Sequence, residues 1–140
     1  MPLHFAYGAN LDAAGMAARC PGAKALGPAR LARHRLAVAT GGWLTVVRDP
    51  REDVHGLLWE LGFADLAGLD RFEETARGLY AKLQQPVIGA AGPRRAIVYV
   101  AAPSPGAKPR ADYLAAVAEA ARAAGLPAAA QDALRRLGAK

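Results

Sequence analysis

The chain has a single cysteine, Cys20, so no disulfide bond can form within it. A reducing compartment fits this composition, and we expect a cytoplasmic protein. No apolar run approaches the ~20 residues that a membrane-spanning helix needs. The N-terminus also lacks the basic segment and the apolar stretch of a secretory signal peptide. The sequence therefore predicts no association with a membrane.

Clusters of metal-binding residues are also missing. His4, His34 and His55 are far apart and form no H-x-x-H or H-E-x-x-H pattern. Cys20 has no second cysteine or histidine near it at the spacing that a zinc site requires. We therefore expect no metal site in this protein.

Positive charge exceeds negative charge, and the formal net charge is +6. This excess permits weak attraction to anions, including acidic metabolites and nucleic acids. The arginines are scattered along the chain, however, and no dense basic block contains interleaved aromatic residues. Nucleic acid is therefore not an expected partner.

The composition is that of a globular protein with an aliphatic core. A length of 140 residues predicts one domain spanning residues 1–140. Apolar residues make up 53% of the chain and charged residues 21%, which distinguishes it from a disordered chain. Aromatic residues make up only 6%, so small and aliphatic side chains are expected to fill the core.

Several strand patterns follow one another through short turns, and helices are inserted among them rather than alternating with them. This order argues against a doubly wound parallel sheet and favours an α+β fold, a small mostly antiparallel β-barrel with flanking helices. We expect the barrel core at about residues 3–101 and a C-terminal helical extension at about 111–137. The expected strands are 3–7, 26–31, 35–39, 43–47, 54–61, 79–88 and 95–100, the expected helices are 11–19, 63–73, 111–124 and 128–137, and residues 49–53 are expected to form a polar loop.

The stretch from Phe5 to Asn10 connects the first expected strand to the first expected helix. Gly8 interrupts the alternating pattern and can adopt a positive φ. Asn10 occupies the position of an N-cap ahead of the helix. Such a turn leaves several backbone N–H groups unpaired, so it can bind an anion or an oxyanion. An ordinary strand–turn–helix connection explains the same residues, and both interpretations stay open.

Glu73 is a carboxylate at a position where an apolar residue is expected. In a helix that begins at Phe63, the apolar stripe consists of Phe63, Leu66 and Leu69. Position 73, which is Glu73, projects between Leu66 and Leu69 near the centre of that stripe. A carboxyl group in the interior has a raised pKa, which suits a group that accepts and returns a proton near pH 7. If the helix instead ends at Phe72, Glu73 lies in a solvated loop.

Three short elements of the sequence match motifs of one known protein family. Tyr7-Gly8-Ala9-Asn10 is similar to a Tyr-Gly-Ser-Asn loop. Leu69-Asp70-x-x-Glu73 and Gly78-Leu79-Tyr80 are similar to Leu-Asp-x-x-Glu and Gly-x-Tyr elements. With these elements in this order, the chain resembles the γ-glutamylcyclotransferase-like family over about residues 3–101. The resemblance implies the barrel fold of the avirulence-induced-gene-like and butirosin-cyclotransferase-like proteins.

Two positions depart from the pattern of the family. Ala9 replaces the usual serine, which removes one hydroxyl from the loop but leaves its backbone N–H. Glu74 stands where many relatives have glycine, which puts the local turn and the rim of the pocket in doubt.

The resemblance implies a role for each matched residue. In the family, the backbone of the loop that matches residues 7–10 binds the γ-glutamyl part of the substrate. The glutamate that matches Glu73 is the acid/base catalyst. Tyr7 and Tyr80 would line the pocket or orient the substrate, although core packing with a satisfied hydroxyl explains both tyrosines equally well.

The reaction of the family cuts a γ-glutamyl-amine bond by intramolecular attack. The α-amine of the substrate attacks its own γ-carbonyl, closes 5-oxoproline and releases an amine. Since the nucleophile belongs to the substrate, the resemblance implies no cofactor. The expected partner is a small-molecule γ-glutamyl substrate.

Three functions remain open at this point. The first is a γ-glutamylcyclotransferase-like enzyme. The second is a related cyclotransferase that acts on a γ-glutamylamine or removes a γ-glutamyl group from a biosynthetic intermediate, and it would differ in the space beyond the γ-glutamyl moiety. The third is a non-catalytic small-molecule-binding module on the same fold, with Glu73 exposed or salt-bridged and no cleft beside Gly8. The sequence predicts no particular oligomeric state.

Overall fold

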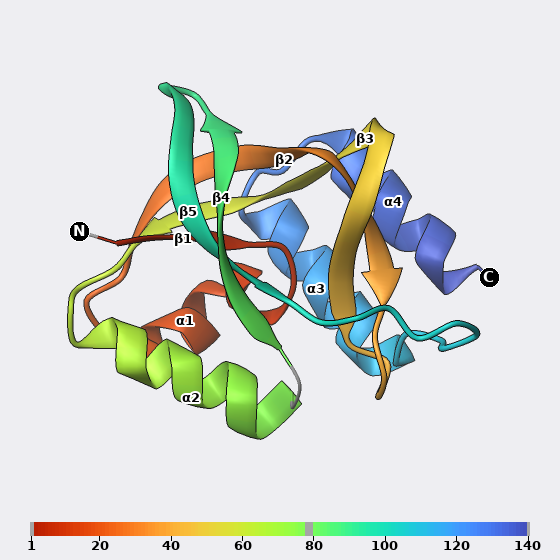
Figure 1. Cartoon of the computed structure of the whole chain (residues 1–140), viewed down its shortest axis with the longest axis horizontal. Coiled ribbons are helices and arrows are strands. Elements are labelled where there is room, and N and C mark those ends of the chain that lie inside the picture. Colours follow the sequence, from red (N-terminus) through yellow and green to blue (C-terminus); the bar gives the residue numbers. More distant parts are fainter. Residues whose placement is uncertain (1, 78–79, 140) are drawn as a thin grey trace.

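The computed structural model describes residues 2–77 and 80–139, without the side chains of residues 74–77. Within this part of the chain, the strands form a closed barrel in the order β1-β3-β2-β4-β5 (Figure 1). The strands are β1 (Leu3–Ala6), β2 (Lys24–Val38), β3 (Leu44–Glu60), β4 (Ala81–Gly89) and β5 (Gly92–Val100). The helical elements are the 3-10 turn η1 (Ala9–Leu11), α1 (Ala13–Arg19), α2 (Asp65–Arg77), α3 (Ala111–Ala123) and α4 (Ala128–Gly138). The predicted α+β class is confirmed.

The short strand β1 closes the barrel, because it lies between β3 and β5. It pairs antiparallel with β3 through all four of its residues. Its contact with β5 is parallel, with His4 opposite Ile97. The pairings of β2 with β3, of β2 with β4 and of β4 with β5 are antiparallel. The barrel is therefore mostly antiparallel, as predicted.

Strands β2 and β3 form a long hairpin where the sequence predicted shorter pieces. The segments expected at 26–31 and 35–39 belong to one strand, and the loop expected at 49–53 lies inside β3. Both differences arise where the register shifts around Arg33, whose φ is 62°. Arginine–aspartate salt bridges join the two strands along this stretch. The register passes from Asp53 opposite Ala32 to Arg48 opposite His34, so the polar residues 49–52 form a bulge within β3.

Helix α2 begins later and ends later than predicted. It starts at Asp65, whose carboxylate accepts a hydrogen bond of 2.8 Å from the N–H of Gly62. Phe63 precedes the helix and is 81% exposed, so the prediction that it belongs to the apolar stripe is wrong. The helix continues to Arg77, which places Glu73 inside it. The expected strand start at Leu79, with Gly78 before it, lies outside the described residues.

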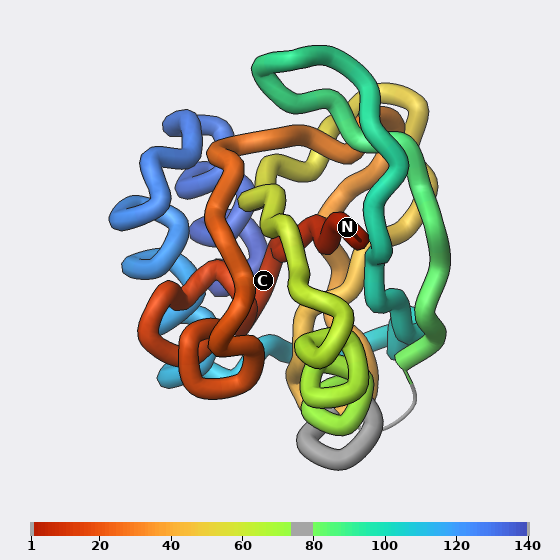
Figure 2. Tube along the Cα trace, turned by 90° about the vertical axis from the view of Figure 1, so that its left-hand side faces the viewer, coloured from red at the N-terminus to blue at the C-terminus, as the bar shows by residue number. Residues whose placement is uncertain are grey.

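The C-terminal helices α3 and α4 pack on each other, on the side of the molecule opposite the β4–β5 hairpin (Figure 2). Val117 and Ala121 of α3 are buried, as are Ala130 and Leu134 of α4. Helix α4 also contacts β2 and β3, and α3 contacts η1. The C-terminal helices therefore support the turn that follows β1. Within the described residues, no helix combines the length and the apolar composition that crossing a membrane requires.

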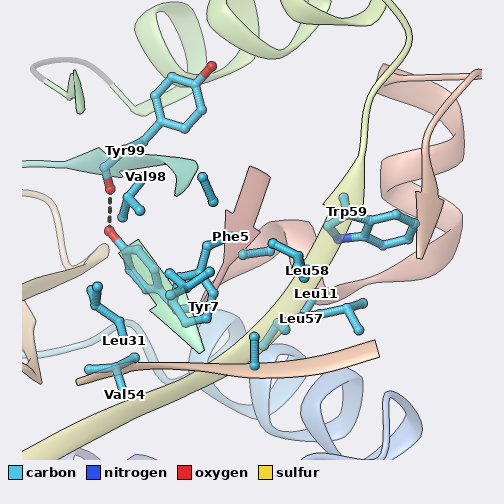
Figure 3. Packing of buried hydrophobic residues seen from close by; sticks show 14 of the residues in the cluster. Phe5, Tyr7, Leu11, Leu31, Val54, Leu57, Leu58, Trp59, Val98 and Tyr99 are labelled. Carbon is cyan, nitrogen blue, oxygen red and sulfur yellow. Dashed lines mark hydrogen bonds between the residues drawn. The ribbon is translucent and has the colours of Figure 1, made fainter. Parts of the chain in front are cut away.

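The core is largely aliphatic. Phe5 and Val98 are fully buried, and Leu31 is 2% exposed. Figure 3 shows these side chains packed around Tyr7, whose hydroxyl points toward the backbone of Tyr99. Burying an apolar side chain of this size contributes ~1.5–3 kcal/mol. This packing holds the end of β1 in a fixed position relative to β5.

Candidate active site

A pocket lies along β1 and the turn that follows it. It has about 270 Å³ of empty space, which includes space open to solvent. Its lining comes from residues 4–10 together with Leu44, Glu73, Tyr80 and Tyr99. The structure thus brings together all the site residues predicted from the sequence, which are Tyr7, Gly8, Ala9, Asn10, Glu73 and Tyr80.

Glu73 projects from α2 into the interior and is 5% exposed. Its Oε1 accepts a hydrogen bond of 3.2 Å from Nδ2 of Asn10. The alternative in which the helix ends at Phe72 and leaves Glu73 in solvent is wrong, because four further residues of α2 follow Glu73. The predicted position of this carboxylate, facing the protein interior, is confirmed.

Asn10 is not the N-cap of α1, contrary to prediction. Asp12 has this position, since its Oδ2 accepts a hydrogen bond of 3.0 Å from the N–H of Gly15. Asn10 lies inside η1 and is 4% exposed. Its carbonyl oxygen accepts a hydrogen bond of 3.0 Å from the indole N–H of Trp59, which fixes the turn on β3. The Asn10 side chain therefore belongs to the pocket rather than to the helix end.

The turn that follows β1 begins with backbone N–H groups that have no acceptor within the turn. The N–H of Leu11 donates to the carbonyl of Gly8 at 3.0 Å, and that of Asp12 donates to the carbonyl of Ala9 at 3.2 Å. The N–H groups of Ala9 and Asn10 come before these donors, and the first N–H groups of a helical turn have no acceptor within it. Gly8 has a φ of −132°, so the positive φ suggested by the sequence is wrong.

His4 connects the barrel closure to the pocket and is 2% exposed. Its Nδ1 lies 3.0 Å from the carbonyl oxygen of Ile97, which can only accept, so Nδ1 carries the hydrogen. Its Nε2 lies 3.2 Å from Nδ2 of Asn10 and accepts a hydrogen bond from that amide. The amide group of Asn10 therefore donates to both His4 and Glu73.

The environment of His4 predicts a pH-dependent stability. Burial lowers its pKa from the usual 6.5 to about 4, with a further lowering by the charge of Arg19 and an opposing effect of the hydrogen bond to Ile97. Between these two pH values the unfolded chain binds a proton that the folded chain does not, so stability falls as the pH falls. A shift of this size corresponds to ~3 kcal/mol of unfolding free energy at 1.36 kcal/mol per pH unit.

Urea denaturation between pH 7 and pH 4 checks this prediction. The His4→Gln variant is expected to lose most of that slope, because glutamine does not titrate. The matched variant His55→Gln replaces a histidine outside the pocket and should retain the slope. Parallel pH curves for wild type and His4→Gln would contradict the prediction.

The tyrosines of the pocket are held by hydrogen bonds to neighbouring groups. The hydroxyl of Tyr7 donates to the carbonyl of Tyr99, and that of Tyr80 donates to the carbonyl of Leu44. The hydroxyl of Tyr99 donates to the carboxylate of Asp70. Burial raises the pKa of Tyr7 well above its usual value, and burial together with Asp70 raises the pKa of Tyr99. Tyr7 and Tyr99 therefore stay protonated at neutral pH and act as hydrogen-bond donors.

Two of the polar residues that line the pocket, His4 and Tyr99, were not anticipated as site residues. Both lie at the closure between β1 and β5, and the sequence does not indicate which strands meet there. The sequence shows a histidine inside the first expected strand, and the structure shows that all four residues of this strand are buried. Burial on both faces becomes visible only when the barrel is closed.

Comparison with known proteins agrees with this architecture. The family model described as the AIG2-like family matches residues 53–134. The chain belongs to the AIG2-like family. The matched segment contains Glu73 and Tyr80, whereas the loop at residues 7–10 lies outside it.

Relatives of this AIG2-like chain include a curated gamma-glutamylcyclotransferase from Bos taurus. It is 30% identical over 95 residues, which cover 61% of this chain and 50% of the bovine protein. The chain thus spans about half the length of this relative.

Two solved structures have the same fold. A structure named gamma-glutamyl cyclotransferase has a TM-score of 0.86 and 25% identity, covering 97% of this chain and 87% of its own. An uncharacterized protein from Homo sapiens has a TM-score of 0.85 and 25% identity, covering 96% and 86% respectively. The AIG2-like chain therefore has the γ-glutamylcyclotransferase fold that the sequence predicted.

Proposed function

We propose that this chain is a γ-glutamylcyclotransferase-like enzyme in which Glu73 is the general acid/base. The reaction converts a γ-glutamyl amine into 5-oxoproline and a free amine. The observation that carries the proposal is the buried carboxylate of Glu73, which lies in one small pocket with the turn at Gly8–Asn10. The name of the bovine relative and the fold support the same reaction.

Proton transfer through Glu73 accounts for both halves of the reaction. The α-ammonium of the substrate first loses one proton to solvent. The neutral amine then attacks the γ-carbonyl carbon, and the attacking nitrogen gives a second proton to the carboxylate of Glu73. The C–N bond to the leaving amine breaks as Glu73 returns the proton to that nitrogen. General acid/base catalysis of this kind typically contributes ~10²–10⁴-fold in rate. Holding the chain of the substrate in a cyclic conformation adds the entropic advantage of an oriented intramolecular attack.

The other titratable groups of the pocket are less suited to this role. The lowered pKa of His4 keeps its ring neutral at pH 7, and both of its nitrogens have hydrogen-bond partners. The raised pKa values of Tyr7 and Tyr99 keep their hydroxyls protonated. Glu73 is therefore better suited than His4, Tyr7 or Tyr99 to accept a proton from the substrate at neutral pH.

The turn after β1 supplies the electrostatic part of the proposed mechanism. Negative charge develops on the γ-carbonyl oxygen in the tetrahedral intermediate. Ala9 and Asn10 are residues of the pocket lining, and their N–H groups are the proposed donors to that oxygen. Ala9 provides its N–H as serine would, so the departure from the family pattern leaves this role intact.

A second cleft bears on the identity of the leaving amine. It has about 880 Å³ of empty space, including open solvent, and shares Gly8 and Ala9 with the first pocket. Asp12 from the start of α1 and Tyr113 from α3 also line it. We propose that the leaving amine points toward this cleft.

A panel of γ-glutamyl compounds tests the proposal. Wild-type protein is incubated with γ-glutamyl amino acids, γ-glutamyl alkylamines and larger γ-glutamyl amines, and 5-oxoproline is quantified by mass spectrometry. We expect 5-oxoproline and free amine in equal amounts from at least one compound, above a control with heat-denatured protein. Release of 5-oxoproline from the larger γ-glutamyl amines would favour a cyclotransferase that acts on a γ-glutamylamine or on a biosynthetic intermediate, over an enzyme specific for γ-glutamyl amino acids.

The non-catalytic module is the competing interpretation. It predicts no cleft beside Gly8, whereas Gly8 lines two cavities in the described part of the chain. Calorimetry on the same panel separates the two functions. Binding without release of 5-oxoproline from any compound would contradict the enzyme and favour the module.

A further inference from the structure

The side-chain amide of Asn10 has one satisfied end and one unsatisfied end. Its nitrogen is 3.2 Å from Nε2 of His4 and 3.2 Å from Oε1 of Glu73. Its oxygen, Oδ1, is buried and has no hydrogen-bond partner among the described residues. Buried amide oxygens in folded proteins are nearly always hydrogen-bonded, so this one marks a place for a donor from a bound molecule.

His4 determines which way this amide faces. The carbonyl of Ile97 requires a hydrogen on Nδ1 of His4, so Nε2 of the neutral ring is an acceptor. Only the NH₂ end of Asn10 can pair with that acceptor. The reversed amide would place its oxygen against Nε2 and against the carboxylate of Glu73, which are both acceptors. The observed orientation therefore pairs the NH₂ end of Asn10 with both acceptors and leaves Oδ1 of Asn10 without a donor among the described residues.

We propose that His4 is a positioning residue that fixes the Asn10 amide with its NH₂ toward Glu73 and its oxygen toward an N–H donor of the substrate amine. This inference rests on the proposed function, because the amine is the one that attacks in the cyclisation. Asn10 then contacts both the acid/base carboxylate and the nucleophile. The two groups that exchange a proton are held by one rigid amide, whose orientation is set from the barrel closure.

The tautomer of His4 tests the orientation without reference to activity. A long-range ¹H–¹⁵N NMR spectrum of the uniformly labelled wild-type protein at pH 7 distinguishes the two neutral tautomers from the imidazolium. We expect His4 in the neutral form with the hydrogen on Nδ1, with His34 and His55 as internal references. An Nε2–H tautomer or a charged ring would overturn the proposal.

Two substitutions separate positioning from structural support. The amide of glutamine at position 4 reaches about as far as Nε2, so His4→Gln keeps an acceptor for Asn10 and loses the bond to Ile97. The shorter asparagine reaches about as far as Nδ1, so His4→Asn keeps the bond to Ile97 and loses the acceptor for Asn10. If His4 acts by positioning Asn10, His4→Asn should have the lower kcat. If His4 acts only by supporting the barrel, His4→Gln should have the lower kcat.

Steady-state kinetics of the two variants is measured with the γ-glutamyl compound that the wild-type protein turns over. We expect His4→Gln to retain kcat within ~3-fold, and His4→Asn to lose ~10-fold or more in kcat, as expected for the loss of one hydrogen bond that orders the reacting groups. Urea denaturation measures the folded fraction of each variant, to which kcat is normalised. Equal kcat values for the two variants, or a greater loss in His4→Gln, would overturn the positioning role.

The two arms also separate this inference from the proposed function. If wild type releases no 5-oxoproline from any compound, the proposed function and the contact with a substrate amine both fail, while the tautomer still decides the orientation of the Asn10 amide. If wild type is active but His4 has another tautomer, or kcat of His4→Asn is not lower than that of His4→Gln, only the role of His4 fails.

Discussion

The Glu73→Gln variant is expected to lose ~10²–10⁴-fold of the rate of 5-oxoproline release, which is the usual contribution of a general acid/base. Glutamine has nearly the same shape as glutamate but neither accepts nor returns a proton at neutral pH. Its Oε1 can still accept the hydrogen bond from Asn10, so the geometry of the pocket should persist. The loss should therefore fall on kcat, with a small change in KM. Steady-state kinetics with the preferred γ-glutamyl compound measures this effect.

Asp70→Asn is the matched control for that variant. Asp70 lies one turn earlier on α2, and its carboxylate faces Lys82 and Tyr99 rather than Asn10. The same change from carboxylate to amide should leave kcat within a few-fold of wild type. Release of 5-oxoproline by Glu73→Gln at the wild-type rate would exclude Glu73 as the acid/base. An equal loss in both variants would indicate a general sensitivity of α2 rather than a specific proton transfer.

The Gly56→Ala variant is expected to lose ~3 kcal/mol or more of unfolding free energy, at the upper end for overpacking of a core. Gly56 lies in β3 where β1 crosses closely. A Cβ at this position would lie 2.2 Å from the carbonyl oxygen of Ala6 and 2.7 Å from the ring of Phe5. The carbonyl belongs to the backbone, so relief requires separating β1 from β3. Because folded proteins are stable by only ~5–15 kcal/mol, this variant should be visibly destabilised at room temperature.

Gly89→Ala makes the same substitution at a position with space for it. A Cβ there would meet Leu58 at 3.9 Å and Ala29 at 4.0 Å, which are ordinary contacts. We expect a change within ~1 kcal/mol, because the loss of glycine flexibility in the unfolded chain offsets small strains. Urea denaturation of both variants measures the difference. Equal stability of Gly56→Ala and wild type would show that β1 is not held tightly against β3.

The interior position of Glu73 could be predicted because it depends on local geometry. Residues three and four positions apart share a face of a helix, so the fully buried Leu69 places Glu73 on the same side. The end of the helix could not be predicted with equal accuracy, since pairing of β4 with the barrel helps to decide where α2 stops. The start of the helix was also misplaced: α2 begins at Asp65, so Phe63 precedes it and is exposed instead of lying on the buried face.

The role of the Asn10 side chain could not be predicted from neighbouring residues. Asparagine and aspartate are about equally good N-caps, and Asp12 stands only two positions after Asn10. Asp12 caps α1, and Asn10 instead pairs with His4 and Glu73. The preference for His4 and Glu73 exists only in the folded barrel, because Glu73 is 63 positions away in the chain.

The sequence by itself determined the α+β class, the order of the elements, the turn at residues 7–10 and the carboxylate on the inner face of α2. These depend on periodicity and turn chemistry, which act within a few residues. The tertiary structure alone decided that this carboxylate and this turn share a pocket, and that His4 orients the amide between them. The physical reason is barrel closure, which brings His4 within hydrogen-bonding distance of Ile97, 93 positions away.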